Sequence, residues 1–134
     1  MARDYLTRAA MTLEEARTAA ANGIHSLAVR RAQETVELSL KAALRFLAIE
    51  YPREDDVSEV LLKVKGTRTL PEWFNDRLEF LMHVSSDLAR KRGPAFYGDK
   101  ITATPASHLF TAEEGVRAIK EAEEVFTLCK RLVR

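Results

Sequence analysis

Apolar residues recur every three or four positions along most of this chain, and this spacing restricts the possible folds more than any other feature of the sequence. It is typical of helices that bury one side. Helix-forming residues (Ala, Leu, Glu, Arg and Lys) dominate the composition, whereas the 134 residues include only five Gly and four Pro. No segment has the alternation expected of a strand. The sequence therefore predicts an all-α fold and a single domain over residues 1–134.

The helix boundaries are predicted from the ends of the apolar stripes and from helix-breaking residues. Asn22 and Gly23 tolerate positive φ and should end the first helix, and Pro71 suits the first turn of a later one. Four long helices and one short helix are expected, at residues 4–21, 24–50, 56–63, 71–91 and 111–134. The short connection between the first two makes them antiparallel, so an up-down helical bundle is the simplest architecture.

Capping boxes are predicted at the starts of two helices. Thr111 and Glu114 in "TAEE" have the required spacing before the last helix, and Asp56 with Glu59 resembles the same motif before the short helix. The segments expected to be loops are the basic stretch "KVKGTRTLP" at 63–71 and the longer stretch at 92–110.

Charge and cysteine content exclude several classes of protein. Lys and Arg number 21 against 20 Asp and Glu, so the chain as a whole does not attract nucleic acid or membranes, and any anion site must be local. Cys129 is the only cysteine, which excludes an intrachain disulfide, and its place on an apolar helix face predicts burial. No apolar run approaches the roughly 18–20 residues of a membrane span. The start of the chain lacks the apolar core of a signal peptide, so we expect a cytoplasmic protein.

Motifs for metal and cofactor binding are not recognised in the sequence. His25, His83 and His108 are scattered, and none has a second His or Cys at metal-binding spacing. No glycine-rich loop has a spacing suited to phosphate binding. We therefore expect neither a metal nor a cofactor.

A polar row lies beside the apolar stripe of the second helix. Gln33, Glu37, Lys41 and Arg45 follow one another at four-residue steps. Glu37 precedes Lys41 in the favourable order for an ion pair along a helix. The simplest interpretation of this row is a solvent-exposed face, and the alternative is a functional one.

A basic and aromatic cluster occurs late in the chain. Arg90, Lys91 and Arg92 stand beside "AFYGD", which contains Phe96 and Tyr97. Arginines offer paired donors to phosphate, and a tyrosine ring offers a surface for stacking. The alternative is structural: the basic residues would bind the carbonyls at the end of a helix, while the two rings would close the end of the bundle.

The stretch "RLEFLMH" places Arg77 six residues before His83. Six residues of helix turn through about 600° and rise about 9 Å, so the two side chains point about 120° apart. They can approach one ligand only through the reach of the arginine or through a second subunit. Structurally, His83 would be half-buried and Arg77 would join a surface ion pair.

The segment "RRAQETVELSLKAALRFL" of the second helix resembles the signature helix of the HEPN domain family, with Glu37 and Lys41 four residues apart. "YPREDDVSEVLL", "LPEWFNDRL", "RGPAFYGD" and "HLFTAEEGVRAIKEAEEV" are similar to the corresponding segments of archaeal-type members. The resemblance covers nearly the whole chain, and the order of these segments carries it.

The resemblance implies a bundle of about five helices, a homodimer, and association with a minimal nucleotidyltransferase protein, often as a toxin–antitoxin pair. It also implies nucleotide binding. Many other members of the family are metal-independent ribonucleases that use an arginine and a histidine at the spacing of Arg77 and His83. The present chain departs from those nucleases in having Leu78 directly after the arginine, where a polar residue is usual, and a long loop between the pair and the last helix.

Three functions are therefore considered. The first is a binding module for a nucleotide, RNA or a partner nucleotidyltransferase, with ligand-binding residues Arg90, Arg92, Tyr97, Asp99 and Lys41, to which Arg77 could contribute. The second is a ribonuclease in which His83 acts as acid and base and Arg77 binds the phosphate. The third is a helical scaffold that binds no ligand.

Overall fold

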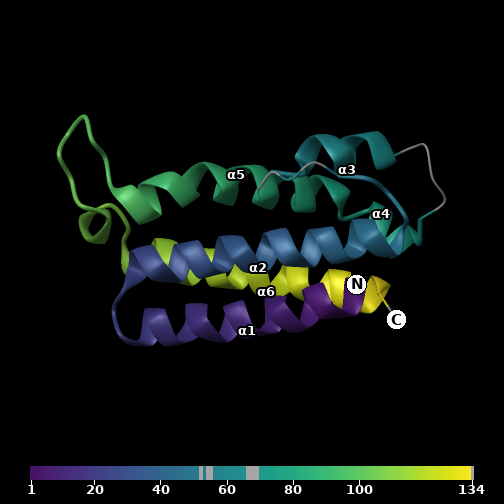
Figure 1. Ribbon diagram of the computed structural model, residues 1–134, viewed down its shortest axis with the longest axis horizontal. Helices are drawn as coiled ribbons and strands as arrows, with labels where there is room; N and C mark the ends of the chain where they lie inside the picture. Colours follow the sequence, from purple (N-terminus) through teal and green to yellow (C-terminus); the bar gives the residue numbers. More distant parts are fainter. Residues whose placement is uncertain (52, 54–55, 66–69, 134) are drawn as a thin grey trace.

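The computed structural model describes residues 1–51, 53, 56–65 and 70–133. These residues form an all-α structure, as predicted, and their sole β-type pairing is an isolated bridge between Asp99 and Thr104. The elements in chain order are α1 (Ala2–Ala21), α2 (His25–Phe46), α3 (Ser58–Val64), α4 (Glu72–Asn75), α5 (Leu78–Tyr97), the 3-10 helix η1 (Ala106–His108) and α6 (Ala112–Leu132) (Figure 1).

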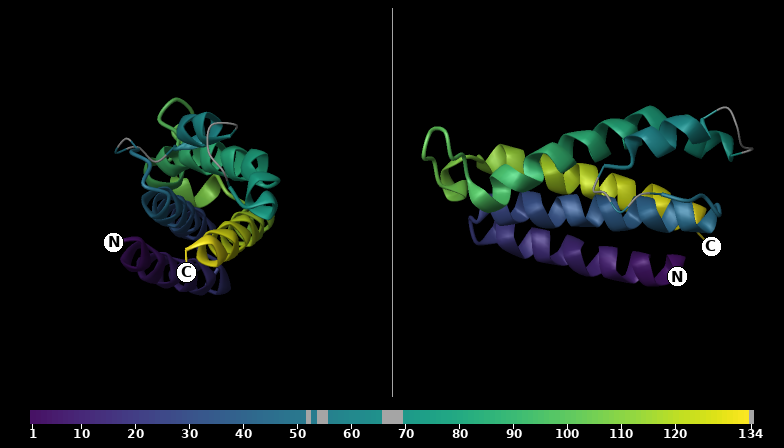
Figure 2. Two further views of the ribbon diagram at one scale, coloured as in Figure 1. Left: turned by 90° about the vertical axis from the view of Figure 1, so that its right-hand side faces the viewer. Right: turned by 45° about the horizontal axis from the view of Figure 1, so that its top comes forward.

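The four long helices, α1, α2, α5 and α6, lie side by side with their axes in nearly the same direction (Figure 1). Successive long helices run in opposite directions, so the predicted up-down bundle is confirmed, and the two termini lie at the same end. Helix α2 contacts α1, α6 and α5, while α3 packs on the outside of α5 (Figure 2). The central position of α2 makes it the helix around which the others are arranged.

The core is built from the apolar stripes that the sequence predicts. Leu40 and Leu44 of α2 are fully buried, together with Leu81 of α5 and Val125 of α6. Cys129 is also fully buried, as predicted, and burial raises the pKa of its thiol. The thiol therefore behaves as a small apolar side chain of the core.

The two helices α1 and α2 end in the same backbone motif, although only one of them has a glycine there. After α1, Gly23 adopts φ +74°, and the N–H of Ile24 donates to the carbonyl of Ala19 at 2.9 Å. After α2, Ala48 adopts φ 57°, and the N–H of Ile49 donates to the carbonyl of Leu44 at 2.9 Å. These are Schellman motifs, which satisfy carbonyls that the helix end leaves free. The prediction that the second helix continues to residue 50 is therefore wrong, because Ala48 takes the left-handed conformation usually given to glycine.

The predicted helix at 71–91 is in fact two helices. The short α4 begins directly after Pro71, and α5 begins at Leu78 after Arg77, whose φ of −104° and ψ of 2° interrupt the helical backbone. Helix α5 also continues beyond residue 91 to Tyr97 with Pro94 inside it. Pro94 lies in the last turn, so the helix loses one donor near its end and does not have to propagate beyond it.

Glycine ends α5 for a steric reason. Gly98 has φ 77°, and a Cβ at this position would overlap the carbonyl oxygen of Thr104. The chain reverses here through paired hydrogen bonds between Asp99 and Thr104, at 2.8 and 3.0 Å. The prediction of an irregular stretch at 92–110 is therefore wrong for residues 92–97 and for η1.

One of the two predicted capping boxes is present. The hydroxyl of Thr111 accepts from the N–H of Glu114 at 3.1 Å, and the carboxylate of Glu114 accepts from the N–H of Thr111 at 3.3 Å. The predicted box of Asp56 and Glu59 is absent, because Val57 is the N-cap residue and Asp56 instead accepts from the N–H of Ser58 at 2.9 Å.

Two expected breaks fall partly outside the described residues. The predicted loop at 63–71 includes residues 66–69, and the predicted break after the second helix includes residues 52, 54 and 55. None of the helices that the structure describes is long and apolar enough to cross a membrane.

The two Schellman motifs give a matched stability test. Gly23→Ala should lower the free energy of unfolding by about 1 kcal/mol, because an alanine is disfavoured in the left-handed conformation. Ala48→Gly should raise the same quantity by a similar amount, about 1 kcal/mol, because it relieves that strain. Urea denaturation followed by circular dichroism measures both. Changes of the same sign in the two variants would contradict the shared backbone motif.

Candidate functional site

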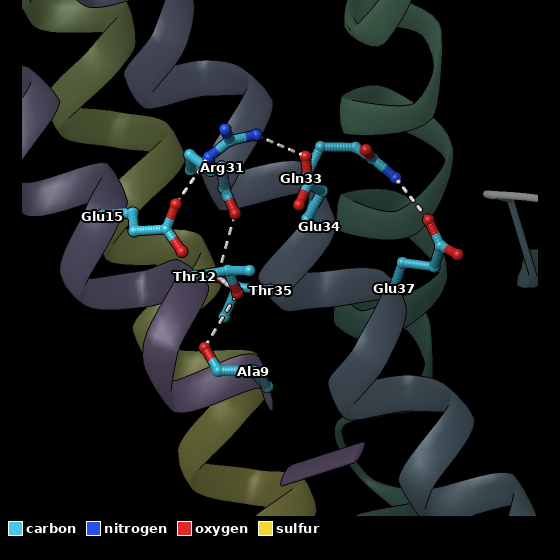
Figure 3. Close-up of polar contacts among 8 residues, drawn as sticks. All are labelled: Ala9, Thr12, Glu15, Arg31, Gln33, Glu34, Thr35 and Glu37. Carbon is cyan, nitrogen blue, oxygen red and sulfur yellow. Dashed lines mark hydrogen bonds and ion pairs between the residues drawn. The ribbon is translucent and has the colours of Figure 1, made fainter. Parts of the chain in front are cut away.

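Helix α2 carries a polar chain that is largely buried. The side-chain amide of Gln33 donates to Glu37 at 3.2 Å, and the ammonium of Lys41 donates to the other oxygen of Glu37 at 2.7 Å. Gln33 is only 2% exposed and Lys41 only 9%. We call these three residues the α2 ladder. Figure 3 shows Gln33 and Glu37 on the side of α2 that faces α5.

The α2 ladder corrects the interpretation of the polar row as a solvent-exposed face. That interpretation holds for Arg45, which is exposed, but not for Gln33 and Lys41, which are buried. The predicted ion pair of Glu37 and Lys41 is present. Gln33 faces α5 (Figure 3), and Lys41 lies beside the ring of Tyr51, with 5.8 Å between its ammonium and the ring centre. The periodicity of α2 alone does not reveal either neighbour.

The opposite side of α2 uses its polar groups to hold α1. Arg31 pairs with Glu15 of α1 at 3.0 Å and with Glu34 at 2.7 Å (Figure 3). The hydroxyls of Thr12 and Thr35 lie 2.8 Å apart between the same two helices. These groups satisfy one another, so this side of α2 has a structural role.

A small pocket lies where the N-terminal half of α2 meets the end of α5. It has a volume of about 90 Å³. We call it the α2–α5 pocket, and its lining residues are Arg30, Gln33, Glu34, Arg92, Phe96 and Tyr97. The predicted ligand-binding residues Arg92 and Tyr97 are therefore brought together, as part of a larger set drawn from two helices.

Arg30 is the member of this set that sequence analysis missed. Its guanidinium carbon lies 4.2 Å from the centre of the Phe96 ring, and that ring lies 4.5 Å from the ring of Tyr97. The available signal was its position three residues before Gln33, which places the two on one side of the helix. Without knowledge that α5 ends beside α2, nothing in the sequence connects Arg30 with Arg92.

The electrostatics of the α2–α5 pocket favour an anion. Burial is the main cause that lowers the pKa of Arg30, and the charges of Arg31 and Arg92 lower it further, while Glu34 opposes them. The guanidinium remains charged. A negative ligand between Arg30 and Arg92 would therefore relieve both the desolvation and the repulsion.

The neighbouring ring surfaces are open to solvent. Phe96 is 53% exposed and Tyr97 is 72% exposed. The structural alternative for this cluster, in which the two rings close the end of the bundle, is therefore wrong. Its other half is wrong as well, because α5 continues beyond Arg92 and has no basic residue in its last turn.

The remaining predicted ligand-binding residues lie elsewhere. Arg90 pairs with Asp87 at 3.1 Å. Asp99 accepts from the N–H groups of Ile101 and Thr102 at 2.9 and 3.3 Å, which stabilises the turn after α5. None of the predicted residues Arg90, Asp99 and Lys41 lines the α2–α5 pocket.

Lys41 lines a different hollow, a groove of about 810 Å³ between α1 and the C-terminal half of α2. In this groove the hydroxyl of Tyr51 donates to that of Tyr5 at 3.3 Å. Burial, followed by this hydrogen bond, raises the pKa of Tyr51 to about 12, while the charge of Arg45 acts in the opposite direction. The neutral phenol of Tyr51 is therefore favoured in the folded chain.

Arg77 and His83 are not joined within one chain. Arg77 pairs with Glu124 of α6 at 2.5 Å and lies over the ring of Phe80, with 4.7 Å between its guanidinium carbon and the ring centre. The expected surface ion pair of Arg77 is thus present. The expectation of a half-buried His83 is wrong, because this side chain is exposed near Glu121 of α6. An active site from these two residues would need a second copy of the chain.

The described residues contain no group of three His, Cys, Asp or Glu side chains that could hold a metal ion. The three histidines lie on different elements: His25 begins α2, His83 lies in α5, and His108 ends η1.

Comparison with known proteins identifies relatives of this fold. A family model of the HEPN domain matches residues 2–132. The crystal structure of ST0689, an archaeal HEPN homologue, has a TM-score of 0.75 and 22% identity, and the match covers 100% of this chain and 98% of that protein. The crystal structure of TT1696 from Thermus thermophilus has the same TM-score of 0.75 and 22% identity, with coverages of 98% and 97%. No curated protein sequence matches the chain.

The α2 ladder predicts an asymmetry between two substitutions. Glu37→Gln should lower the free energy of unfolding by about 2 kcal/mol, because it leaves a largely buried ammonium without its counter-charge. Lys41→Met should cost less, because Glu37 keeps its bond to Gln33 and its side chain is 20% exposed, compared with 11% for Lys41. Chemical denaturation measures both values. A larger loss of unfolding free energy in Lys41→Met than in Glu37→Gln would contradict the role of Glu37 as the counter-charge of a buried ammonium.

The raised pKa of Tyr51 predicts a distinct step in an alkaline titration. Absorbance at the phenolate band should contain a component of one tyrosine with a midpoint near pH 12, and this component should vanish in Tyr51→Phe but not in Tyr97→Phe. The stabilisation from the neutral phenol is complete below the ordinary tyrosine pKa of 10.0 and is lost as pH rises to about 12. The free energy of unfolding should therefore fall less steeply over this range in Tyr51→Phe. A late component that persists in Tyr51→Phe would assign it to another residue.

Proposed function

The chain belongs to the HEPN domain family, as its sequence motifs predicted, and on that premise we propose that it is a binding protein that holds the phosphate of a nucleotide or of RNA in the α2–α5 pocket. The observation that carries the proposal is the approach of Arg30 and Arg92, from two different helices, beside two adjoining aromatic rings. Forked guanidinium donors suit phosphate oxygens, and aromatic rings suit bases.

The size of the pocket defines how such a ligand would bind. A volume of about 90 Å³ suits a single phosphate group, whereas the base would lie outside on the exposed ring of Tyr97. Stacking on one open ring tolerates any base. We therefore expect little sequence preference, and stronger binding of a single strand than of a duplex, whose bases are not free to stack.

The charge balance supports a local site. The net charge of +1 gives no broad attraction to nucleic acid, so binding must depend on the few cations at the pocket. If Arg30 and Arg92 neutralise about two phosphate charges of a single strand, log K should fall with log salt with a slope of only about −1.4. A steep slope would instead indicate a wide basic surface.

The HEPN resemblance adds two further parts to the proposal: a homodimer, and a cytoplasmic partnership with a minimal nucleotidyltransferase of the toxin–antitoxin type. Both concern partners and are independent of the ligand. The ribonuclease alternative has less support in a single chain, because the guanidinium of Arg77 already pairs with Glu124. The scaffold alternative does not account for the cations gathered at the α2–α5 pocket.

Substitutions at the pocket test the binding proposal. Arg30→Ala and Arg92→Ala should each weaken binding of a labelled single-stranded RNA of about ten nucleotides by about tenfold, since each removes a charged hydrogen-bond donor. Tyr97→Ala should weaken it by a similar factor, about tenfold, whereas Tyr97→Phe should not, because the ring is retained. Fluorescence anisotropy measures the RNA, and calorimetric titration measures AMP and ATP.

The matched control is Arg3→Ala, which removes an exposed arginine near the start of α1. This variant should bind like the wild type. Equal affinities of wild type, Arg30→Ala and Arg92→Ala, or no detectable binding of RNA or nucleotide to the wild type, would refute the proposal.

A further inference from the structure

The groove between α1 and α2 is built by a reversal of the chain after α2. Ala48 turns the backbone, and Tyr51 then lies beside Tyr5 of α1, with their hydroxyl oxygens 3.3 Å apart. The groove is therefore walled by two helices and by the segment that follows α2. Its volume of about 810 Å³ lies within the range of small-molecule sites.

Two arginines on the helices that wall this groove form no ion pair with the part of the chain that the structure describes. Arg8 lies over the ring of Tyr5, with 5.7 Å between its guanidinium carbon and the ring centre. Arg45 is exposed, one helical turn after Lys41, and its charge acts on Tyr51. Neither arginine forms an ion pair with any of the described residues, whereas Lys41 is paired with Glu37. No described carboxylate would therefore compete with an anion for Arg8 and Arg45.

The side chains at the base of the groove are held by contacts with one another. The ammonium of Lys41 is 2.7 Å from Glu37 and lies 5.8 Å from the centre of the Tyr51 ring. The Tyr5–Tyr51 hydrogen bond joins α1 to the segment after α2. A site whose rings and charges are already held in place loses little entropy when it binds a ligand.

The charges at the groove favour a doubly charged ligand. The basic residues that line it are Arg8, Lys41, Arg45 and Arg53, and the acidic ones are Glu37 and Glu50. The described lining thus has two more positive than negative side chains, which matches a phosphate monoester near neutral pH. The two phenol rings provide a surface for an apolar or aromatic group on the same ligand.

We propose that this groove is a second ligand site, which binds a small phosphate monoester through Arg8 and Arg45 and packs the ester group against Tyr5 and Tyr51. It is separate from the α2–α5 pocket in position and in residues. It does not depend on the proposed binding of RNA or nucleotides there.

Phenyl phosphate is a suitable probe, because it combines a phosphate dianion with one ring. In an NMR titration of the full chain, it should shift the ring signals of Tyr5 and Tyr51 in a saturable way. Inorganic phosphate, which lacks the ring, and benzoate, which carries one charge, should each bind more weakly. The absence of saturable shifts at both tyrosines would overturn the proposal.

Substitutions then test whether Arg8 and Arg45 bind the phosphate of the probe. The double variant Arg8→Ala with Arg45→Ala should weaken the binding that is seen at the tyrosine signals at least about tenfold. Arg45→Lys should retain part of it, because the charge remains while the paired donors are lost. Thermal unfolding of each variant by circular dichroism shows whether it is folded. Unchanged affinity in the folded double variant would overturn the proposal.

Arg92→Ala separates the two sites. This variant should retain the shifts of Tyr5 and Tyr51 with phenyl phosphate even if it loses RNA binding. Failure of RNA binding in the wild type, together with saturable shifts at the groove, would reject the proposed function and support the groove. Loss of the tyrosine shifts in Arg92→Ala would mean that the groove is not an independent site.

Discussion

The burial of α2 on several sides at once is the constraint on which the rest of the structure depends. This helix packs against α1, α5 and α6, and twelve of its residues are buried, including Gln33, Thr35, Ser39 and Lys41. A polar group inside a protein is costly unless it is paired. Thr35 meets this requirement towards Thr12 of α1. The amide N–H of Gln33 and the ammonium of Lys41 meet it through Glu37 of the same helix, whereas the amide oxygen of Gln33 and the hydroxyl of Ser39 have no partner among the described residues. The polar contacts that cross to another helix, those of Thr35 with Thr12 and of Arg31 with Glu15, therefore help to fix how α2 is oriented against α1.

The two candidate sites follow from the same arrangement, because each lies where a segment packed on α2 ends or turns away. Beside the N-terminal half of α2, helix α5 ends at Tyr97, and Gln33 of α2 borders the α2–α5 pocket. At the C-terminal end of α2, the turn at Ala48 forms one wall of the groove between α1 and α2. Glu37 and Lys41 line this groove. The α2 ladder thus connects two hollows of different size and chemistry. The smaller one offers two guanidinium groups and exposed rings, and the larger one offers an open groove with a hydrogen-bonded pair of phenols.

The elements that the sequence predicts correctly are those determined by residues close together in the chain. The helical stripes, the Gly23 end of α1 and the Thr111 capping box all depend on neighbours within a few positions. The errors occur where a helix end or a contact depends on residues far apart in the chain, or on a residue type unusual for that position. Ala48 ends α2 without a glycine, and Pro94 is tolerated because the helix ends one turn later. Likewise, only part of the α2–α5 pocket was predicted. Arg92 and Tyr97 are close in sequence, but Arg30 lies beside them only because α5 packs on α2.

Net charge is a poor guide to anion binding in a chain of this kind, and the ion pairs explain why. Arg17, Arg31, Arg77 and Arg90 each have a carboxylate partner, so their charges are largely cancelled where they stand. Among the described residues, Arg30 and Arg45 have no such pair, and each borders one of the two hollows. A balanced total of 21 basic and 20 acidic side chains therefore conceals an uneven distribution. Since screened charges act over only about 10 Å, it is this local imbalance that a bound phosphate would experience.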